Sequence, residues 1–238
     1  MMQLWAAIDL MNGSAVTLVQ GKESDRTVWG QEPPALAERW EREGADGLHI
    51  IDLDAAFERG SNREVIEEIV REVGIPVQVG GGIRRDDVAR AWLDAGAGRV
   101  VLGTMAYGSR PVLTRLLRDY GPDRIVVAAD YKDGQIVTKG WREGRGVSVE
   151  SAAEDFERAG VVNLLTTSVG RDGMRAGPDV ETVRRLAEAR KLSVIASGGI
   201  RDIADLVELR DAGAGGAVIG RALYEGTVNL AEAKKELS

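Results

Sequence analysis

The sequence contains no cysteine and a single histidine, His49, among its 238 residues. Without thiols the chain forms no disulfide bonds, offers no thiol nucleophile and builds no cysteine-ligated metal site. A single histidine also excludes the multi-histidine zinc centres found in many hydrolases. Catalysis by a thiol or by such a metal centre is therefore excluded.

Long apolar runs and a positive net charge are also missing. No apolar stretch approaches the roughly 18 residues of a membrane-spanning helix, and residues 1–5 do not form a basic segment followed by an apolar core. We therefore expect a cytoplasmic protein without membrane spans. The net charge of −7 would repel nucleic-acid phosphates and anionic membranes, so we expect neither as a partner. An anionic small ligand would need local hydrogen-bond donors.

One segment of the chain occurs twice. The sequence Gly-Gly-Ile-Arg at residues 81–84 recurs at residues 198–201, and Tyr107 recurs as Tyr224. Both pairs are 117 positions apart (198 − 81 and 224 − 107), which is about half of the chain. A constant offset of this size indicates an internal two-fold duplication.

Short apolar segments alternate with amphipathic segments along the whole chain. The strands expected from this pattern are residues 4–9, 48–53, 76–79, 99–102, 125–130, 162–167, 193–197 and 217–219. The helices expected between them are residues 33–43, 86–95, 111–120, 148–159, 180–190 and 203–212, with further helices starting at Asn62 as N-cap and near the C-terminus. Two short extra strands are expected at residues 14–20 and 135–139.

Eight alternating strand and helix units of this kind predict a (β/α)8 barrel with a parallel sheet. We expect a single barrel domain over residues 1–238, built from two repeated half-barrels at about residues 1–121 and 122–238. An open doubly wound sheet is the alternative.

Aspartates end two of the apolar strands at related places in the two halves, at Asp9 and Asp130. Active sites of such barrels lie at the carboxyl ends of the strands. A carboxylate there either closes a structural hydrogen bond or carries a proton. Two carboxylates in different surroundings hold different pKa values, so that one acts as general base and the other as general acid. Proton transfer of this kind fits an isomerase or lyase better than a hydrolase.

Glycine-rich turns follow four of the expected strands, in two pairs related by the repeat. They are Gly80-Gly81-Gly82, Gly103-Thr104, Ser197-Gly198-Gly199 and Gly220-Arg221. Each turn is either only a tight connection or an anion site, because it presents free backbone N–H groups before a helix. Two pairs on neighbouring strands predict two phosphate sites on opposite sides of the barrel mouth. We therefore expect a small-molecule ligand phosphorylated at both ends.

Three further features leave two interpretations open. His49 is either a core residue with a satisfied hydrogen bond or a ligand contact. The polar, glycine-rich segment 168–178 is either a surface loop or a lid that closes over substrate. Trp141 follows a glycine and is available to stack on a planar ring.

A set of ordered motifs spans the chain from end to end. In chain order they are Ala7-Ile8-Asp9-Leu10, Leu18-Val19-Gln20-Gly21, residues 49–56, residues 80–84, Asp130 with Gly140-Trp141, Thr167 with Arg171-Asp172-Gly173, and residues 197–201. Together they resemble the ProFAR isomerase family of histidine biosynthesis. The resemblance implies a duplicated (β/α)8 barrel without metal or organic cofactor. It also implies an Amadori rearrangement that converts the aminoaldose of a bisphosphorylated carboxamide ribonucleotide into the aminoketose.

The resemblance also implies a role for individual residues. Asp9 would accept a proton and Asp130 would donate one, while Thr167 and Asp172 would help with ring opening and substrate positioning. The remaining contacts that it implies are Gly82, Gly103 and Thr104 for one phosphate, Gly177, Gly199 and Gly220 for the other, and His49, Arg84 and Trp141 along the substrate. We expect the protein to act as a monomer.

One position departs from the pattern of the family. Many relatives carry arginine where this chain has Thr17. The contact to a substrate phosphate or carboxylate that this arginine would make is either missing or supplied by Arg142, Arg145, Arg171 or Arg175. Some relatives also isomerise phosphoribosyl anthranilate, and residues 59–62 are reminiscent of them. Thr17 argues against a dual-substrate site that uses the arginine.

Two other functions are compatible with the barrel. The cyclase subunit of imidazole glycerol phosphate synthase shares both aspartates, but it usually has Cys-Leu-Asp-Val where this chain has residues 7–10 as Ala-Ile-Asp-Leu. A non-catalytic barrel that binds phosphorylated ligands is the other alternative. Such a protein would be free to lose one of the two aspartates, and this chain has both.

Overall fold

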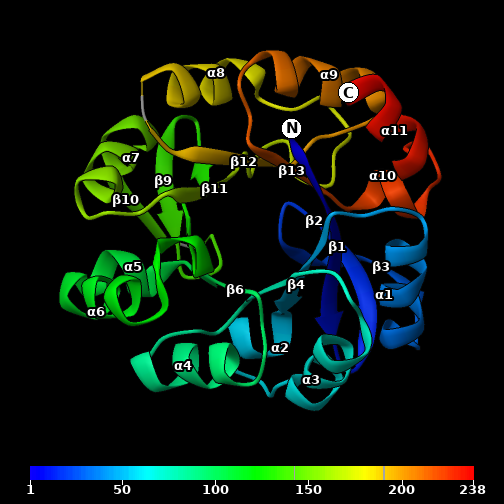
Figure 1. Cartoon of the computed structure of the whole chain (residues 1–238), viewed down its shortest axis with the longest axis horizontal. Coiled ribbons are helices and arrows are strands. Elements are labelled where there is room, and N and C mark those ends of the chain that lie inside the picture. Colours follow the sequence, from blue (N-terminus) through cyan, green and yellow to red (C-terminus); the bar gives the residue numbers. More distant parts are fainter. Residues whose placement is uncertain (142, 190) are drawn as a thin grey trace.

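Eight parallel strands form a closed barrel in the computed structural model, which describes residues 1–141, 143–189 and 191–238 (Figure 1). In barrel order the strands are β1 (Gln3–Met11), β4 (Gly47–Asp52), β5 (Val77–Gly80), β6 (Arg99–Leu102), β7 (Ile125–Ala128), β11 (Asn163–Thr167), β12 (Ser193–Ser197) and β13 (Gly216–Ile219). Strand β13 pairs with β1 in parallel and closes the ring. The predicted (β/α)8 barrel is confirmed, and the open doubly wound sheet is excluded.

Helices surround the barrel on its outside (Figure 1). The longer helices are α1 (Pro33–Arg42), α3 (Arg63–Glu72), α4 (Asp86–Asp94), α6 (Arg110–Tyr120), α7 (Val149–Arg158), α8 (Val180–Ala189), α9 (Ile203–Asp211) and α11 (Leu230–Leu237). Their bounds agree with the prediction to within a few residues, although the expected end of α8 at Arg190 lies outside the described residues. The sequence pattern did not reveal the short helices α2 (Leu53–Ala56), α5 (Thr104–Gly108), α10 (Arg221–Tyr224) and the 3-10 turn η1 (Pro122–Arg124).

Two antiparallel additions extend the barrel after β1 and after β7. Strands β2 (Ser14–Val19) and β3 (Lys22–Gly30) continue from β1, while β8 (Tyr131–Lys132), β9 (Gln135–Thr138) and β10 (Glu143–Ser148) form a separate three-stranded sheet. Strands β2 and β9 were expected, but β3 and β10 were not. Most of β3 is exposed and polar, so it lacks the alternation that identifies a half-buried strand.

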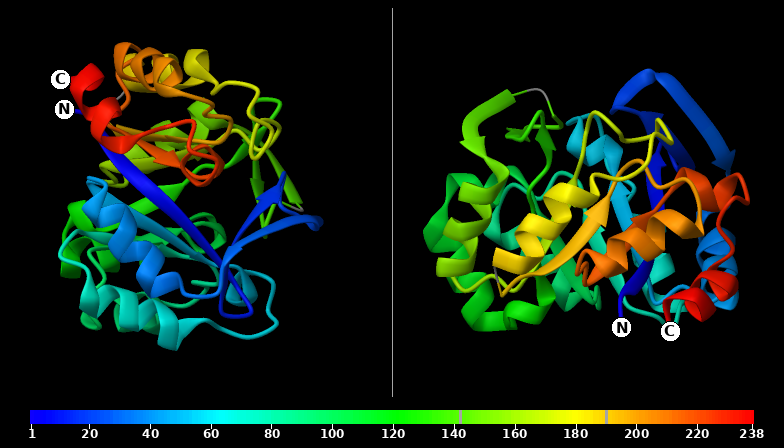
Figure 2. Two further views of the ribbon diagram at one scale, coloured as in Figure 1. Left: turned by 90° about the vertical axis from the view of Figure 1, so that its right-hand side faces the viewer. Right: turned by 90° about the horizontal axis from the view of Figure 1, so that it is seen from above.

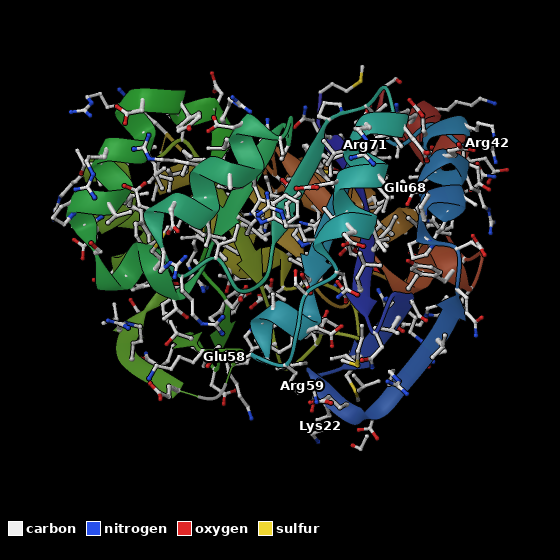
Figure 3. The ribbon with its side chains drawn as sticks, turned by 90° about the horizontal axis from the view of Figure 1, so that it is seen from below. Lys22, Arg42, Glu58, Arg59, Glu68 and Arg71 are labelled. Carbon is white, nitrogen blue, oxygen red and sulfur yellow. The ribbon has the colours of Figure 1, made fainter. Side chains whose placement is uncertain are left out.

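The two additions stand at one end of the barrel, and both chain termini lie at the other end (Figure 2). Lys22, Glu58 and Arg59 lie at the end with the additions (Figure 3). Arg59 forms an ion pair of 2.7 Å there with Glu23. Parallel strands all end on this side, so their carboxyl ends open between the additions.

Two layers of apolar side chains fill the structure. The larger layer lies between the sheet and the helices. The smaller layer fills the inside of the barrel and consists of Trp5, Val101, Val126, Ala128, Leu165, Ile195 and Val218. The inside of the barrel is therefore a packed core rather than a pore, as is usual for this fold. Every helix in the described part of the chain is too short or too polar to cross a lipid bilayer.

Candidate active site

A pocket of about 1030 Å³ opens at the carboxyl ends of the barrel strands. The predicted site residues that line it are Asp9, His49, Gly81, Gly82, Arg84, Gly103, Thr104, Asp130, Trp141, Thr167, Asp172, Ser197, Gly198, Gly199, Gly220 and Arg221. Gly177 lies just behind this lining, where its N–H donates a hydrogen bond of 3.0 Å to the carbonyl of Gly199. The fold thus brings residues from both halves of the sequence to one cavity.

Asp9 lies near the end of β1, between Val16 of β2 and Ile51 of β4. Its side chain is largely buried, and burial raises the pKa of Asp9 to about 7. Water stabilises an ionised carboxylate better than the interior of a protein does, which is the cause of this shift. Near neutral pH, Asp9 therefore holds its proton more firmly than a surface aspartate does.

Asp130 follows β7, which lies on the far side of the barrel from β1. Burial raises the pKa of Asp130, and hydrogen bonds from Trp141 and Thr167 oppose this shift. The indole Nε1 of Trp141 donates to Oδ2 of Asp130 at 2.8 Å. Donors directed at a carboxylate favour its ionised form.

Asp172 belongs to the loop between β11 and α8 and lines the same pocket. Burial raises the pKa of Asp172 to about 7, and the charges of Asp9 and Asp130 add to the effect. The three carboxyl groups are therefore close enough to influence one another. Ionisation of Asp9 and Asp130 therefore disfavours ionisation of Asp172.

His49 combines the two interpretations that the sequence left open. The residue is buried, and its Nδ1 lies 2.8 Å from Nε2 of Gln78. With the amide in this orientation, Nε2 of Gln78 donates to Nδ1, and a neutral ring then carries its proton on Nε2. Burial lowers the pKa of His49 to about 4, which keeps the ring neutral. His49 is thus anchored in the core and offers the pocket an uncharged ring.

Close packing explains the glycines in two of the turns. Gly82 has φ +67°, and a Cβ there would lie 2.7 Å from the carbonyl oxygen of Ala55. Gly199 has φ +89°, and a Cβ there would lie 2.4 Å from the carbonyl oxygen of Gly177. A Cβ on Gly103, in contrast, would meet nothing within 4 Å. The first two glycines are required by the chain itself, whereas Gly103 borders open space in the pocket.

Asn62 precedes α3, but its side chain does not cap this helix as expected. Its Oδ1 accepts from the N–H of Gly13 at 2.8 Å, and its Nδ2 donates to Leu10, Asp52 and Asp54. The amide is fully used in this buried network, so it is not available to the first turn of the helix. The network ties the turn after β1 to the loop after β4.

Thr17 lines the pocket, and its Oγ1 accepts a hydrogen bond of 2.9 Å from Nε1 of Trp29. The arginines considered as replacements are Arg142, which lies outside the described residues, and Arg145, Arg171 and Arg175. Arg175 lines the pocket, where it pairs with Glu225 at 2.6 Å. Arg171 instead donates to carbonyls of its own loop, and Arg145 lies over a tyrosine ring.

The sequence pattern did not reveal several charged residues of the pocket. Lys139, Glu143 and Glu58 also line it. The backbone N–H of Lys139 donates to Oγ1 of Thr104 at 3.0 Å, and its Nζ pairs with Glu143 at 2.8 Å. Lys139 and Glu143 come from the β9–β10 addition. No local sequence motif predicts that this addition lies beside the pocket.

The loop at residues 168–178 lies against the other addition. The N–H of Gln20 donates to the carbonyl of Asp172 at 3.2 Å, and Nε2 of Gln20 donates to the carbonyl of Gly170 at 3.1 Å. Arg221 also donates to the carbonyl of Gly173 at 3.1 Å. The loop is therefore hydrogen-bonded to the β2–β3 turn and to α10 at the edge of the pocket.

Comparison with known proteins gives a consistent result. Residues 3–229 match the family described as histidine biosynthesis protein. A Cenarchaeum symbiosum protein is 44% identical over 96% of this chain and 97% of its own length. Proteins from Geobacter sulfurreducens (45%; 95% and 94% covered) and Methanothrix thermoacetophila (45%; 97% and 96% covered) are similarly close. All three are named 1-(5-phosphoribosyl)-5-((5-phosphoribosylamino)methylideneamino)imidazole-4-carboxamide isomerase, for which ProFAR isomerase is the short name.

Proposed function

The chain belongs to the histidine biosynthesis protein family, and we propose that it catalyses the Amadori rearrangement of ProFAR to PRFAR. The observation that carries the proposal is the placement of Asp9 and Asp130 on opposite strands of one pocket, between two groups of glycine turns. The enzyme is an isomerase that interconverts an aldose and a ketose. The relatives named above have the same function in their names, and none is named as a cyclase subunit or a dual-substrate enzyme.

The reaction requires two proton transfers at the reacting ribose. Asp130 donates a proton to the ring oxygen, the bond from this oxygen to C1 breaks, and C1 forms an iminium group with the attached nitrogen. Asp9 then removes the proton from C2, and the electron pair of that bond forms the C1–C2 double bond of an enaminol. The enaminol becomes the ketose when C1 gains a proton and the C2 hydroxyl loses its own, so that the C2–O bond becomes a carbonyl and no net proton is gained or lost. Side-chain carboxyl groups suffice for these steps, so we propose that no metal or cofactor takes part.

Neighbouring residues assist the two carboxyl groups. Thr167 donates a hydrogen bond to Asp130, and Asp172 shares the electrostatic environment of both aspartates. His49 supplies a neutral ring near the substrate, and Arg84 and Trp141 line the space between the two ends of the pocket. These residues hold the sugar so that its ring oxygen and C2 face opposite carboxyl groups.

Two groups of turns hold the two phosphates. Gly81, Gly82, Gly103 and Thr104 follow the neighbouring strands β5 and β6, and we assign them one phosphate. The second phosphate is assigned to Ser197, Gly198, Gly199, Gly220 and Arg221 after the neighbouring strands β12 and β13, with Gly177 behind them. The strand order puts the two groups on opposite sides of the barrel mouth, which supports a ligand phosphorylated at both ends.

The remaining assignments concern the whole molecule. We infer one barrel domain over residues 1–238 with halves at about 1–121 and 122–238, because the strands of both halves are hydrogen-bonded into one ring. We also infer that the protein is a cytoplasmic monomer. It is inferred to bind neither nucleic acid nor membranes, and the net charge of −7 supports this last inference.

The test is a direct assay with two substrates. Purified protein is incubated with ProFAR, and in parallel with phosphoribosyl anthranilate, in the presence of a metal chelator. We expect turnover of ProFAR that the chelator does not reduce, and far slower turnover of phosphoribosyl anthranilate. A folded protein that leaves ProFAR unchanged would refute the proposal. Comparable turnover of both substrates would assign the dual-substrate function instead.

A further inference from the structure

The two tyrosines that the repeat relates, Tyr107 and Tyr224, make the same contact at two places in the barrel. The hydroxyl of Tyr224 donates to the carbonyl of Ala7 at 2.9 Å, and the hydroxyl of Tyr107 donates to the carbonyl of Ala128 at 3.2 Å. Ala7 precedes Asp9 by two residues, and Ala128 precedes Asp130 by two residues. Each tyrosine thus holds the strand that presents one of the two aspartates.

The rings of Tyr107 and Tyr224 also pack in equivalent ways. Tyr107 lies edge-on to Phe156 of α7, with ring centroids 4.9 Å apart and planes at 79°. Tyr224 lies edge-on to Trp40 of α1, with centroids 5.5 Å apart and planes at 88°. Helices α1 and α7 follow the strands β1 and β7. Each tyrosine therefore joins the strand that bears an aspartate to the helix that follows this strand.

The contacts run between the halves of the sequence. Tyr107 belongs to α5, which follows β6, and it reaches the next strand of the barrel, β7. Tyr224 ends α10, which follows β13, and it reaches β1, the strand that closes the ring. The last unit of each half thereby holds the first strand of the other half.

The outer faces of the two rings are covered differently. Trp29 of β3 stacks on Tyr224 with centroids 5.1 Å apart, whereas the guanidinium carbon of Arg145 in β10 lies 5.2 Å above the ring of Tyr107. Burial raises the pKa of both hydroxyls. The charge of Asp130 raises the pKa of Tyr107 further, and the charge of Asp9 raises that of Tyr224 further. Both hydroxyls therefore stay protonated and act as donors.

We propose that Tyr107 and Tyr224 are positioning residues, each dedicated to one carboxyl group: Tyr107 to Asp130 and Tyr224 to Asp9. In β1, Ala7 and Asp9 are two residues apart and point to the same face. Ala128 is the last residue of β7, and Asp130 follows it by two residues. All four residues line the pocket, so fixing the carbonyl of Ala7 or Ala128 fixes the backbone from which the aspartate reaches the pocket. Proton transfer is sensitive to such placement, because the carboxyl group must lie within hydrogen-bond reach of its proton. The inference rests on the acid and base roles proposed above.

The experiment replaces each tyrosine by phenylalanine, which keeps the ring and removes only the hydroxyl. We expect Tyr107→Phe and Tyr224→Phe each to lower kcat by about tenfold and to change KM by less than about twofold, since neither hydroxyl lines the main pocket. Tyr120→Phe is the matched control, because the Tyr120 hydroxyl also makes a side-chain hydrogen bond, to Asp94, but on the outside of the barrel. This control should keep the kcat of the unmodified protein.

A substrate deuterated at C2 of the reacting ribose separates the two tyrosines. Tyr224→Phe should increase the isotope effect on kcat, because proton removal by Asp9 becomes slower relative to the other steps. Tyr107→Phe should decrease it, because ring opening by Asp130 then limits the rate. An equal change in both variants would mean general loosening of the barrel and would overturn the proposal. An unchanged kcat in both would also overturn it.

A second measurement does not depend on turnover. In protein labelled with ¹³C at the aspartate carboxyl carbons, Tyr107→Phe should shift the NMR signal of Asp130 and leave that of Asp9 in place. Tyr224→Phe should do the reverse. If ProFAR is not converted but this crosswise pattern appears, the proposed function fails while the positioning holds. If both signals shift equally in each variant, the positioning fails regardless of the substrate.

Discussion

The surroundings of Asp9 and Asp130 differ although the two residues hold corresponding places in the barrel. Burial raises the pKa of both carboxyl groups. At Asp130, hydrogen bonds from Trp141 and Thr167 oppose burial, whereas among the described residues no side chain donates to Asp9. The barrel thus supplies equivalent positions, and the chain that follows each strand makes them chemically different.

The hydrogen bond from Trp141 bears on whether Asp130 carries a proton. In the protein without substrate, the donors at Asp130 favour its ionised form, although the proposed role of Asp130 requires a proton. Burial nevertheless raises the pKa of Asp130 overall, and loss of the Trp141 contact would raise it further. Trp141 belongs to the loop that leads into β10 and has φ +66°, a backbone conformation that non-glycine residues adopt uncommonly. The proposed acid thus accepts a hydrogen bond from a loop residue, whereas burial alone raises the pKa of the proposed base.

The largest effect is expected from neutralising either aspartate. Asp9→Asn and Asp130→Asn should each lower kcat by about 10²- to 10⁴-fold, because each removes one proton-transfer group while keeping its size. Steady-state turnover of ProFAR measures the loss, and Asp94→Asn on the outer surface serves as the control. Full activity in Asp130→Asn would end the assignment of two complementary roles.

The same substitutions should differ in their effect on stability. The carboxyl group of an unfolded aspartate has a pKa near 3.9, but that of folded Asp9 is about 7. Between these values the folded protein binds more protons than the unfolded chain, so this group lowers the free energy of unfolding as pH rises from about 4 to 7. Asp9→Asn should therefore stabilise the protein by about 1–3 kcal/mol at pH 8 and by little at pH 4.

Chemical denaturation of both variants at the two pH values tests this expectation. Asp130→Asn should gain less than Asp9→Asn at pH 8, because Trp141 and Thr167 already stabilise the ionised form of Asp130. Equal gains in the two variants would show that the hydrogen bonds at Asp130 do not offset its burial.

The corresponding positions of Asp9 and Asp130 could be predicted from the sequence. The difference between their hydrogen-bond partners could not. Apolar strands that end in Asp9 and Asp130 are visible in a linear pattern, because alternation and strand ends are local properties. The bond from Trp141 to Asp130 depends on the path of a loop, and the exposed strand β3 has no apolar alternation to reveal it. Asn62 was expected to act locally as a cap, yet its amide is bound by groups distant in the sequence.

Trp141→Phe should make the surroundings of Asp130 more like those of Asp9, which accepts no side-chain hydrogen bond from the described residues. Loss of the indole N–H removes a donor from Asp130, so the pKa of Asp130 should rise while that of Asp9 stays where it is. Carboxyl ¹³C NMR during a pH titration gives both values in one sample. Trp29→Phe is the matched control, because its indole N–H is bound to Thr17 and not to a carboxylate. A fall in the Asp130 pKa in Trp141→Phe would contradict the account.

The smallest effect is expected at Thr17, which lines the pocket. Its hydroxyl is already bound by Trp29, which in turn stacks on Tyr224 beside Asp9. Thr17→Val should destabilise the protein by about 1 kcal/mol, because the indole N–H loses its acceptor, and should lower kcat by less than about threefold without changing KM. Thr17→Ser, which keeps the hydroxyl, should behave as the unmodified protein does in both denaturation and kinetics. A tenfold rise of KM in Thr17→Val would instead show that the hydroxyl binds substrate. The role of Thr17 would then not be to hold Trp29 against Tyr224.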